Sequence, residues 1–204
     1  YDHIKSVGQL GGKMHIPVYA TYEVHKAIRN NPIINHNLNG SSKYIEKGKT
    51  FKIEDFHITP FAVPHDSRDN VGYYIEFDGH KLTLATDVGS ITDEVAHYIS
   101  KANHLIIESN YDEEMLKNGI YPIHLKERIT CGTGHLSNRQ TADFLANNFS
   151  SHFRNIWLCH LSGDNNNPEL AYKTISDTLT KKGINIDGDV ELHVLKRNVL
   201  SAKI

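Results

Sequence analysis

The chain has 204 residues, of which 39% are hydrophobic and 23% are charged, and its formal net charge at pH 7 is −2. This length suits one domain of ordinary globular composition, and the sequence has no apolar run near the ~18 residues of a membrane span. The charge excludes an overall basic coat for nucleic acid but not a local basic groove. Two cysteines, Cys131 and Cys159, are too few for a disulfide framework, so we expect a reducing, cytoplasmic location.

The first half of the chain is rich in strand-like segments. They cover residues 51–53, 57–63, 71–77 and 81–86. The last two are joined through Asp78-Gly79, which is a strong signal for a hairpin. Residues 4–10 are a candidate helix that precedes them.

The second half alternates helical and strand-like patterns. Helices are predicted to begin near Ser90 or Thr92, at Ser137 and at Pro168. Strands are predicted at residues 104–107, 155–159 and 190–195. This alternation indicates a layered α/β fold, and the hairpin makes a purely parallel sheet unexpected.

A histidine, an aspartate or a glutamate follows four of the predicted strands. They are His65, Asp87, Glu108 and His160. Ligands of open α/β sheets collect outside the carboxyl ends of the strands, and imidazoles with carboxylates suit Zn, Mn or Fe. Each residue alone is equally consistent with a surface residue, a turn or a helix cap. Their recurrence in the same position favours a metal site.

The start of the chain adds a further pair of possible ligands. Asp2 and His3 are adjacent, and both could reach one metal if the chain turns there. The alternative is an ordinary helix N-terminus with Asp2 as its cap.

These residues together resemble a known family. Asp2-His3 resembles the end of the His-x-His-x-Asp-His motif of the metallo-β-lactamase fold, and His65, Asp87 and His160 resemble its later metal-ligand positions. Further segments resemble the YycJ/WalJ branch of that fold. They are Pro64-His65-Asp66, Asn70-Val71-Gly72-Tyr73, Ala85-Thr86-Asp87-Val88-Gly89, Glu108-Ser109-Asn110-Tyr111-Asp112, Gly134-His135-Leu136-Ser137-Asn138, His160-Leu161-Ser162, Asn165-Asn166 and Pro168-Glu169.

The resemblance implies a fold of the α/β (α+β) class, a four-layer αββα sandwich with a two-metal hydrolase site at its edge. It also implies 5′-exonuclease-type action on DNA. The first two histidines of the motif do not precede Asp2 here. We therefore expect them, and the first strands of the fold, upstream of Tyr1, with residues 1–204 forming the rest of one domain.

The resemblance also implies a role for each site residue. Two divalent ions, Zn, Mn or Fe, would be held by Asp2, His3, His65, Asp87 and His160, and Asp87 would bridge them. Asp2 would also orient the bridging water. His135 would bind a phosphate oxygen or protonate the leaving 3′-oxygen, although a helix cap or surface histidine is an alternative. Glu108 would orient His135, and Asp66 would stand beside His65.

Other functions remain open at this stage. Lys126, Arg128, Arg139 and Arg154 flank the His135 region and could contact phosphates, or form a solvated face. The same fold could hydrolyse small esters, thioesters or lactones, for which we would expect a closed apolar pocket. A metal-free binding module with a decayed site is the third possibility. No membrane partner is expected, and the remaining histidines are interpreted as surface or strand-face residues.

Overall fold

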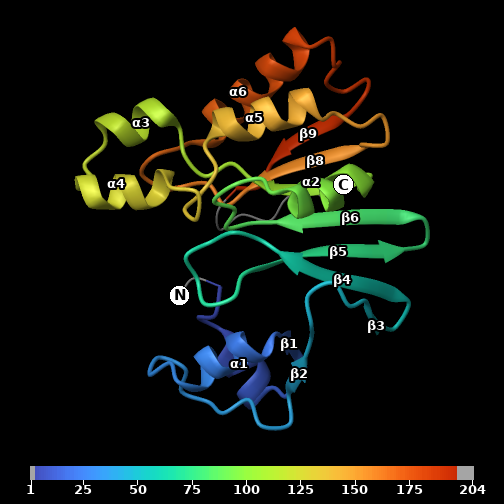
Figure 1. Cartoon of the computed structure of the whole chain (residues 1–204), viewed down its shortest axis with the longest axis vertical. Helices are drawn as coiled ribbons and strands as arrows, with labels where there is room; N and C mark the ends of the chain where they lie inside the picture. The colour runs from blue at the N-terminus through green and yellow to red at the C-terminus, as the bar shows by residue number, and fades with distance from the viewer. Residues whose placement is uncertain (1–2, 197–204) are drawn as a thin grey trace.

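A mixed seven-stranded sheet lies at the centre of the structure (Figure 1). The computed structural model describes residues 3–196, and in it the sheet order is β3-β4-β5-β6-β7-β8-β9. The strands are β3 (Phe51–Ile53), β4 (Phe56–Ala62), β5 (Val71–Phe77), β6 (His80–Ala85), β7 (His104–Glu108), β8 (Asn155–Cys159) and β9 (Glu191–Val194). Pairing is antiparallel from β3 to β6 and parallel from β6 to β9. The predicted mixed sheet is therefore confirmed, and Asp78-Gly79 forms the β5–β6 turn with positive φ at both residues.

Three helices pack on one face of this sheet. They are α2 (Asp93–Lys101), α5 (Asn138–Asn147) and α6 (Pro168–Lys181). Thr92 caps α2, Ser137 forms a capping box at the start of α5, and Asn167 caps α6 with Pro168 in its first turn. Their apolar sides, with residues such as Ile99, Leu145 and Ile175, join the strand residues in one buried cluster.

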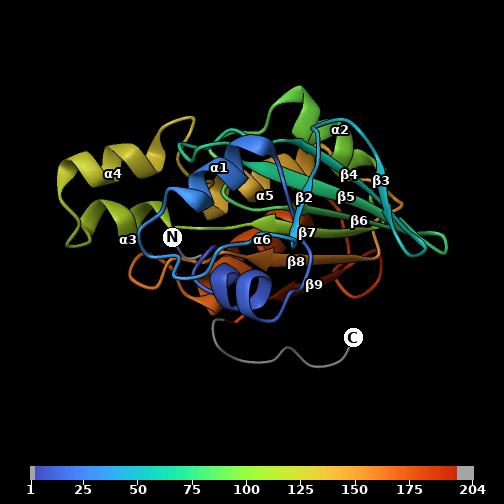
Figure 2. The same cartoon turned by 90° about the horizontal axis from the view of Figure 1, so that it is seen from below.

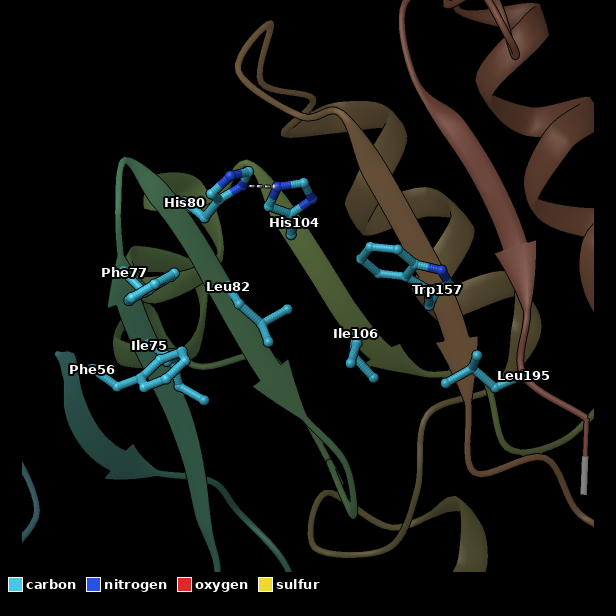
Figure 3. Close-up of a pocket in the computed structure, with 9 residues that line it drawn as sticks. All are labelled: Phe56, Ile75, Phe77, His80, Leu82, His104, Ile106, Trp157 and Leu195. Atoms are coloured by element: carbon cyan, nitrogen blue, oxygen red, sulfur yellow. Dashed lines mark hydrogen bonds between the residues drawn. The ribbon is translucent and has the colours of Figure 1, made fainter. Parts of the chain in front are cut away.

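The opposite face of the sheet is open in the described residues. Because side chains alternate along a strand, the residues between the buried ones point to this side. They line a cavity of about 400 Å³ formed by Phe56, Ile75, Phe77, His80, Leu82, His104, Ile106, Trp157 and Leu195 (Figure 3). Residues 3–196 thus supply one helical layer and one large sheet, together with the two smaller regions below.

The N-terminal region forms a small unit beside the β4 edge (Figure 1). It contains a π-helix (Gly8–Lys13), β1 (Val18–Ala20), α1 (Tyr22–Arg29) and β2 (Ser42–Tyr44), and β1 pairs with β2 in parallel. The helix that we expected from residue 4 is instead a turn followed by the π-helix. The Thr21 hydroxyl donates to Asp69 Oδ2 at 2.6 Å and ties this unit to the loop after β4.

Two short helices extend beyond the sheet in both views (Figures 1 and 2). They are α3 (Glu113–Asn118) and α4 (Ile123–Thr130), and sequence analysis did not anticipate them. No residue of α4 is buried, so its apolar residues do not form the core-facing stripe of a typical surface helix. None of the helices in residues 3–196 has the length and hydropathy of a membrane-spanning segment.

Candidate metal centre

The polar residues at the strand ends converge at one edge of the sheet. His65 follows β4, Asp87 follows β6, Glu108 ends β7 and His160 follows β8. Because β6, β7 and β8 are parallel neighbours, their carboxyl ends meet at this edge, as expected.

Asp87 lies within 4.0 Å of four histidines, of which His135 is the most distant. His3 Nε2 lies 2.7 Å from Asp87 Oδ2, whereas His65 Nε2 and His160 Nε2 lie 3.5 and 3.6 Å from Asp87 Oδ1. Burial alone would raise the pKa of Asp87, but the hydrogen bond from His3 and the charges of these three histidines lower it to about 2. Asp87 is therefore a carboxylate at neutral pH, with both oxygens directed at imidazole nitrogens.

Glu108 is a wholly buried carboxylate that fixes the groups around it. Its Oε2 accepts from Asp87 N at 2.8 Å and from His160 Nδ1 at 2.7 Å, and its Oε1 accepts from Leu136 N at 2.9 Å. His135 Nδ1 lies 3.2 Å from both oxygens. Burial would raise the pKa of Glu108, but the hydrogen bonds from His135 and His160 hold it below its ordinary value.

These hydrogen bonds determine which ring nitrogen each histidine presents. With Nδ1 donating to Glu108, His160 presents Nε2 toward Asp87. His65 Nδ1 donates to the Gly134 carbonyl at 2.9 Å, so it also presents Nε2 toward Asp87. A hydrogen bond of this kind on the second ring nitrogen is the usual way to orient a metal-ligating imidazole.

The arrangement fits a divalent metal ion. Asp87, Glu108, His135 and His160 each offer one ligand atom, and these atoms lie within 4.8 Å of one another. Two ligand atoms bound to a tetrahedral ion lie about 3.4 Å apart, close to the 3.5 and 3.6 Å between Asp87 Oδ1 and the two imidazole nitrogens. Since the Glu108 oxygens already accept several hydrogen bonds, we assign Glu108 to orienting the ligands rather than binding the ion.

The structure brings most of the predicted site residues together. His3, His65, Asp87, His135 and His160 lie at one edge, with His135 centred 4.9 Å from the His65 ring and 5.3 Å from the His160 ring. The predicted contact between Glu108 and His135 is present. Asp2 lies outside the described residues.

The other residues predicted near this centre make different contacts in the structure. Asp66 Oδ1 lies 3.5 Å from His65 Nε2, and its ion pair with Arg128 lowers the pKa of Asp66. Lys126 Nζ donates to a backbone carbonyl, and Arg139 pairs with Asp143 along α5.

A groove of about 930 Å³ leads away from the candidate centre. His135 and His160 are part of its lining, together with the basic residues Lys5, Arg128 and Lys196. Sequence analysis missed Lys5 and Lys196, because nothing in their local sequence places them beside the site. It also missed Asn110 as a support, whose amide donates to the His160 carbonyl at 2.7 Å.

A family model and several known proteins are similar to this chain. A model of the β-lactamase superfamily domain matches residues 1–148. The chain is 35% identical to exodeoxyribonuclease YycJ of Bacillus anthracis over 193 residues, which cover 94% of this chain and 72% of that protein. It is 33% identical to exodeoxyribonuclease WalJ of Streptococcus pneumoniae over the same length, covering 94% of this chain and 71% of that protein.

Solved structures support the same fold. Zn²⁺-bound PqqB from Methylobacterium extorquens is 17% identical, with a TM-score of 0.62 over 90% of this chain and 64% of that one. The metallo-β-lactamase fold protein YhfI from Bacillus subtilis is 15% identical, with a TM-score of 0.64 over 96% of this chain and 70% of that one.

Proposed function

The chain belongs to the β-lactamase superfamily, and from this premise we propose that it is a metal-dependent hydrolase acting as an exodeoxyribonuclease. The observation that carries the proposal is the Asp87 carboxylate, with His3, His65 and His160 directed at its two oxygens beside a basic groove. The exodeoxyribonuclease names of the relatives support DNA as the substrate. The two unpaired cysteines are consistent with a cytoplasmic location.

We propose that the site holds two divalent ions, with Zn, Mn and Fe as candidates. Asp87 suits a bridging role because its Oδ2 faces His3 while its Oδ1 faces His65 and His160. Asp2 is proposed as a further ligand that also orients water. When bound, such ions polarise a phosphate and make a bound water acidic enough to supply hydroxide near neutral pH.

His135 is proposed to act on the substrate. Its Nδ1 is held by Glu108, and the residue lines the groove. In its protonated form, the ring can donate a hydrogen bond to a phosphate oxygen or a proton to the leaving 3′-oxygen. Lys5, Arg128 and Lys196 are suited to pair with the phosphates of the bound strand.

The groove favours DNA over small apolar substrates. A hydrolase of small esters, thioesters or lactones calls for a closed apolar pocket beside the ligands, whereas this groove has charged side chains in its lining. The apolar cavity on the open sheet face shares only Leu195 with the groove. A decayed, metal-free module would have no need of buried Glu108 holding two imidazoles in place.

Elemental analysis tests the metal site. The full-length protein should contain bound metal, and Asp87→Ala and His160→Ala should lose most of it, whereas His152→Ala, on an exposed loop, should keep it. Unchanged metal content in both site variants would reject the ligand assignment.

Cleavage of end-labelled duplex DNA, with and without added Mn²⁺, tests the substrate. We expect metal-dependent release of nucleotides from an end, and its loss in Asp87→Ala. Turnover of a thioester or lactone without DNA cleavage would instead support a small-molecule hydrolase.

A further inference from the structure

The tip of the α3–α4 hairpin exposes two large aliphatic side chains. Ile120 is 93% exposed and Ile123 is 76% exposed, the highest values among the exposed large hydrophobic residues of the described chain. Single exposed apolar residues are common on protein surfaces. These two isoleucines lie three residues apart, one in the α3–α4 loop and one at the first residue of α4, and the two helices project beyond the sheet (Figures 1 and 2).

This tip is held in place by polar contacts. The Tyr121 hydroxyl donates to Asp164 Oδ2 at 2.6 Å, which ties the tip to the loop after β8. Lys126 Nζ donates to the backbone carbonyl of Lys117 at 2.6 Å and joins the two helices. Arg128 pairs with Asp66 beside His65. The two isoleucines are therefore presented from a support that is fastened to the candidate centre.

The tip is continuous with the groove. Tyr121, Leu125 and Arg128 of the hairpin line the same groove as His135 and His160. A polyanion bound to the basic residues of this groove would thus extend from the site along the hairpin toward its tip. A ligand that suits both the basic groove and the apolar tip must carry closely spaced phosphates beside a flat apolar surface. The end of a nucleic acid duplex has both, because its last base pair exposes one face.

We propose that Ile120 and Ile123 form an apolar wedge that packs against the terminal base pair of a DNA duplex whose cleaved strand enters the groove. This proposal rests on the proposed nuclease function. Apolar side chains, isoleucine among them, are used by DNA-binding proteins to wedge against base steps and partly unstack them. Here the wedge would separate the last pair, so that a single strand reaches His135.

The test uses a double variant, Ile120→Ser with Ile123→Ser, in the metal-loaded full-length protein. Both side chains are exposed, so folding should be preserved, and an unchanged urea midpoint checks this. The matched control is Ile16→Ser with Ile33→Ser, two exposed isoleucines of the N-terminal region that are 45% and 53% exposed. Substrates are a blunt duplex with 2-aminopurine as its terminal base, and bis(p-nitrophenyl) phosphate.

We expect kcat/KM for the duplex to fall about tenfold in the tip variant, because the wedge would no longer offset part of the unstacking cost of about a few kcal/mol per base step. Hydrolysis of the small diester should stay within about twofold, and the control should match the wild type on both substrates. The rise in 2-aminopurine fluorescence that accompanies unstacking should be lost only in the tip variant.

Three results would overturn the proposal. If the tip variant cleaves the duplex as fast as the wild type, the wedge is absent, while the nuclease function stands. Should the tip variant differ from the wild type only by losing self-association in gel filtration, the tip is a contact between copies of the chain. If the wild type hydrolyses the small diester but no DNA, the proposed function fails and the wedge with it.

Discussion

Replacing Glu108 with Gln should weaken both the fold and metal binding, because this side chain is wholly buried and acts only as an acceptor. Glu108 Oε2 accepts from Asp87 N and His160 Nδ1, whereas Oε1 accepts from Leu136 N and lies near His135 Nδ1. A glutamine has one oxygen and one NH₂ group. In either orientation, the NH₂ group faces one backbone N–H and one imidazole.

The two kinds of donor respond differently. An imidazole can move its proton to the other nitrogen and accept from the NH₂ group, but a backbone N–H cannot. One buried backbone N–H is therefore left without an acceptor, which costs about 1–3 kcal/mol of unfolding free energy. If His160 moves its proton to Nε2, that nitrogen can no longer bind a metal, and loss of such a supporting partner weakens metal binding by about 10–100-fold.

Urea unfolding in the presence of EDTA measures the first effect on the metal-free protein, and competition with a chromophoric chelator for Zn²⁺ measures the second. Glu114→Gln makes the same chemical change on an exposed face of α3 and should leave both values unchanged. Unfolding free energies of the two variants within about 0.5 kcal/mol of each other, or Zn²⁺ binding equal to the wild type in Glu108→Gln, would refute this account of the buried carboxylate.

Three further predictions follow from local geometry. Gly89→Ala should lower the free energy of unfolding, measured in urea, by about 1–3 kcal/mol. The added Cβ would lie 2.4 Å from a backbone carbon of the loop before α5. Iodoacetamide at pH 8 should label only Cys131 in the folded protein, since a side-chain hydrogen bond lowers the pKa of this exposed thiol while burial raises the pKa of Cys159 to about 12; labelling of Cys159, seen by peptide mass spectrometry, would contradict it. His160→Gly should unfold at higher urea than His160→Ala, because φ is 56° there, whereas at Lys173 in α6 the alanine variant should be the more stable; the same order at both positions would reject the strain argument.

The strand ends could be predicted from the sequence because their signal is local. Each strand segment, such as 104–107, contains its own apolar run. The polar residue at the end of the strand follows that run directly in the sequence. The capping box at Ser137 is equally local, since its partner lies three residues away. The apolar runs with polar residues at their ends are enough to predict that His65, Asp87 and His160 lie at one edge of the sheet.

The features that were missed depend on contacts between distant residues or on short elements. β1 and β2 have three residues each and pair with each other in parallel, so no tight turn joins them as one joins the equally short β3 to β4. Lys5 and Lys196 line one groove although 191 positions separate them. The bond from His160 to Glu108 spans 52 positions, so the sequence suggested one imidazole partner for Glu108 where the structure has two.

The backbone conformation explains how β7 supports the candidate metal site although this strand supplies no proposed ligand. Asp87 and His160 both have left-handed φ values, 55° and 56°, which are costly for residues other than glycine. Such conformations persist only where the surroundings hold them. Asp87 N–H is held by Glu108 and the His160 carbonyl by Asn110, at 2.8 and 2.7 Å. Glu108 and Asn110 stand at and just beyond the end of β7, between β6 and β8. The end of β7 therefore fixes the turns that aim both proposed ligands, and substitutions of Glu108 or Asn110 should weaken metal binding although neither residue is a proposed ligand.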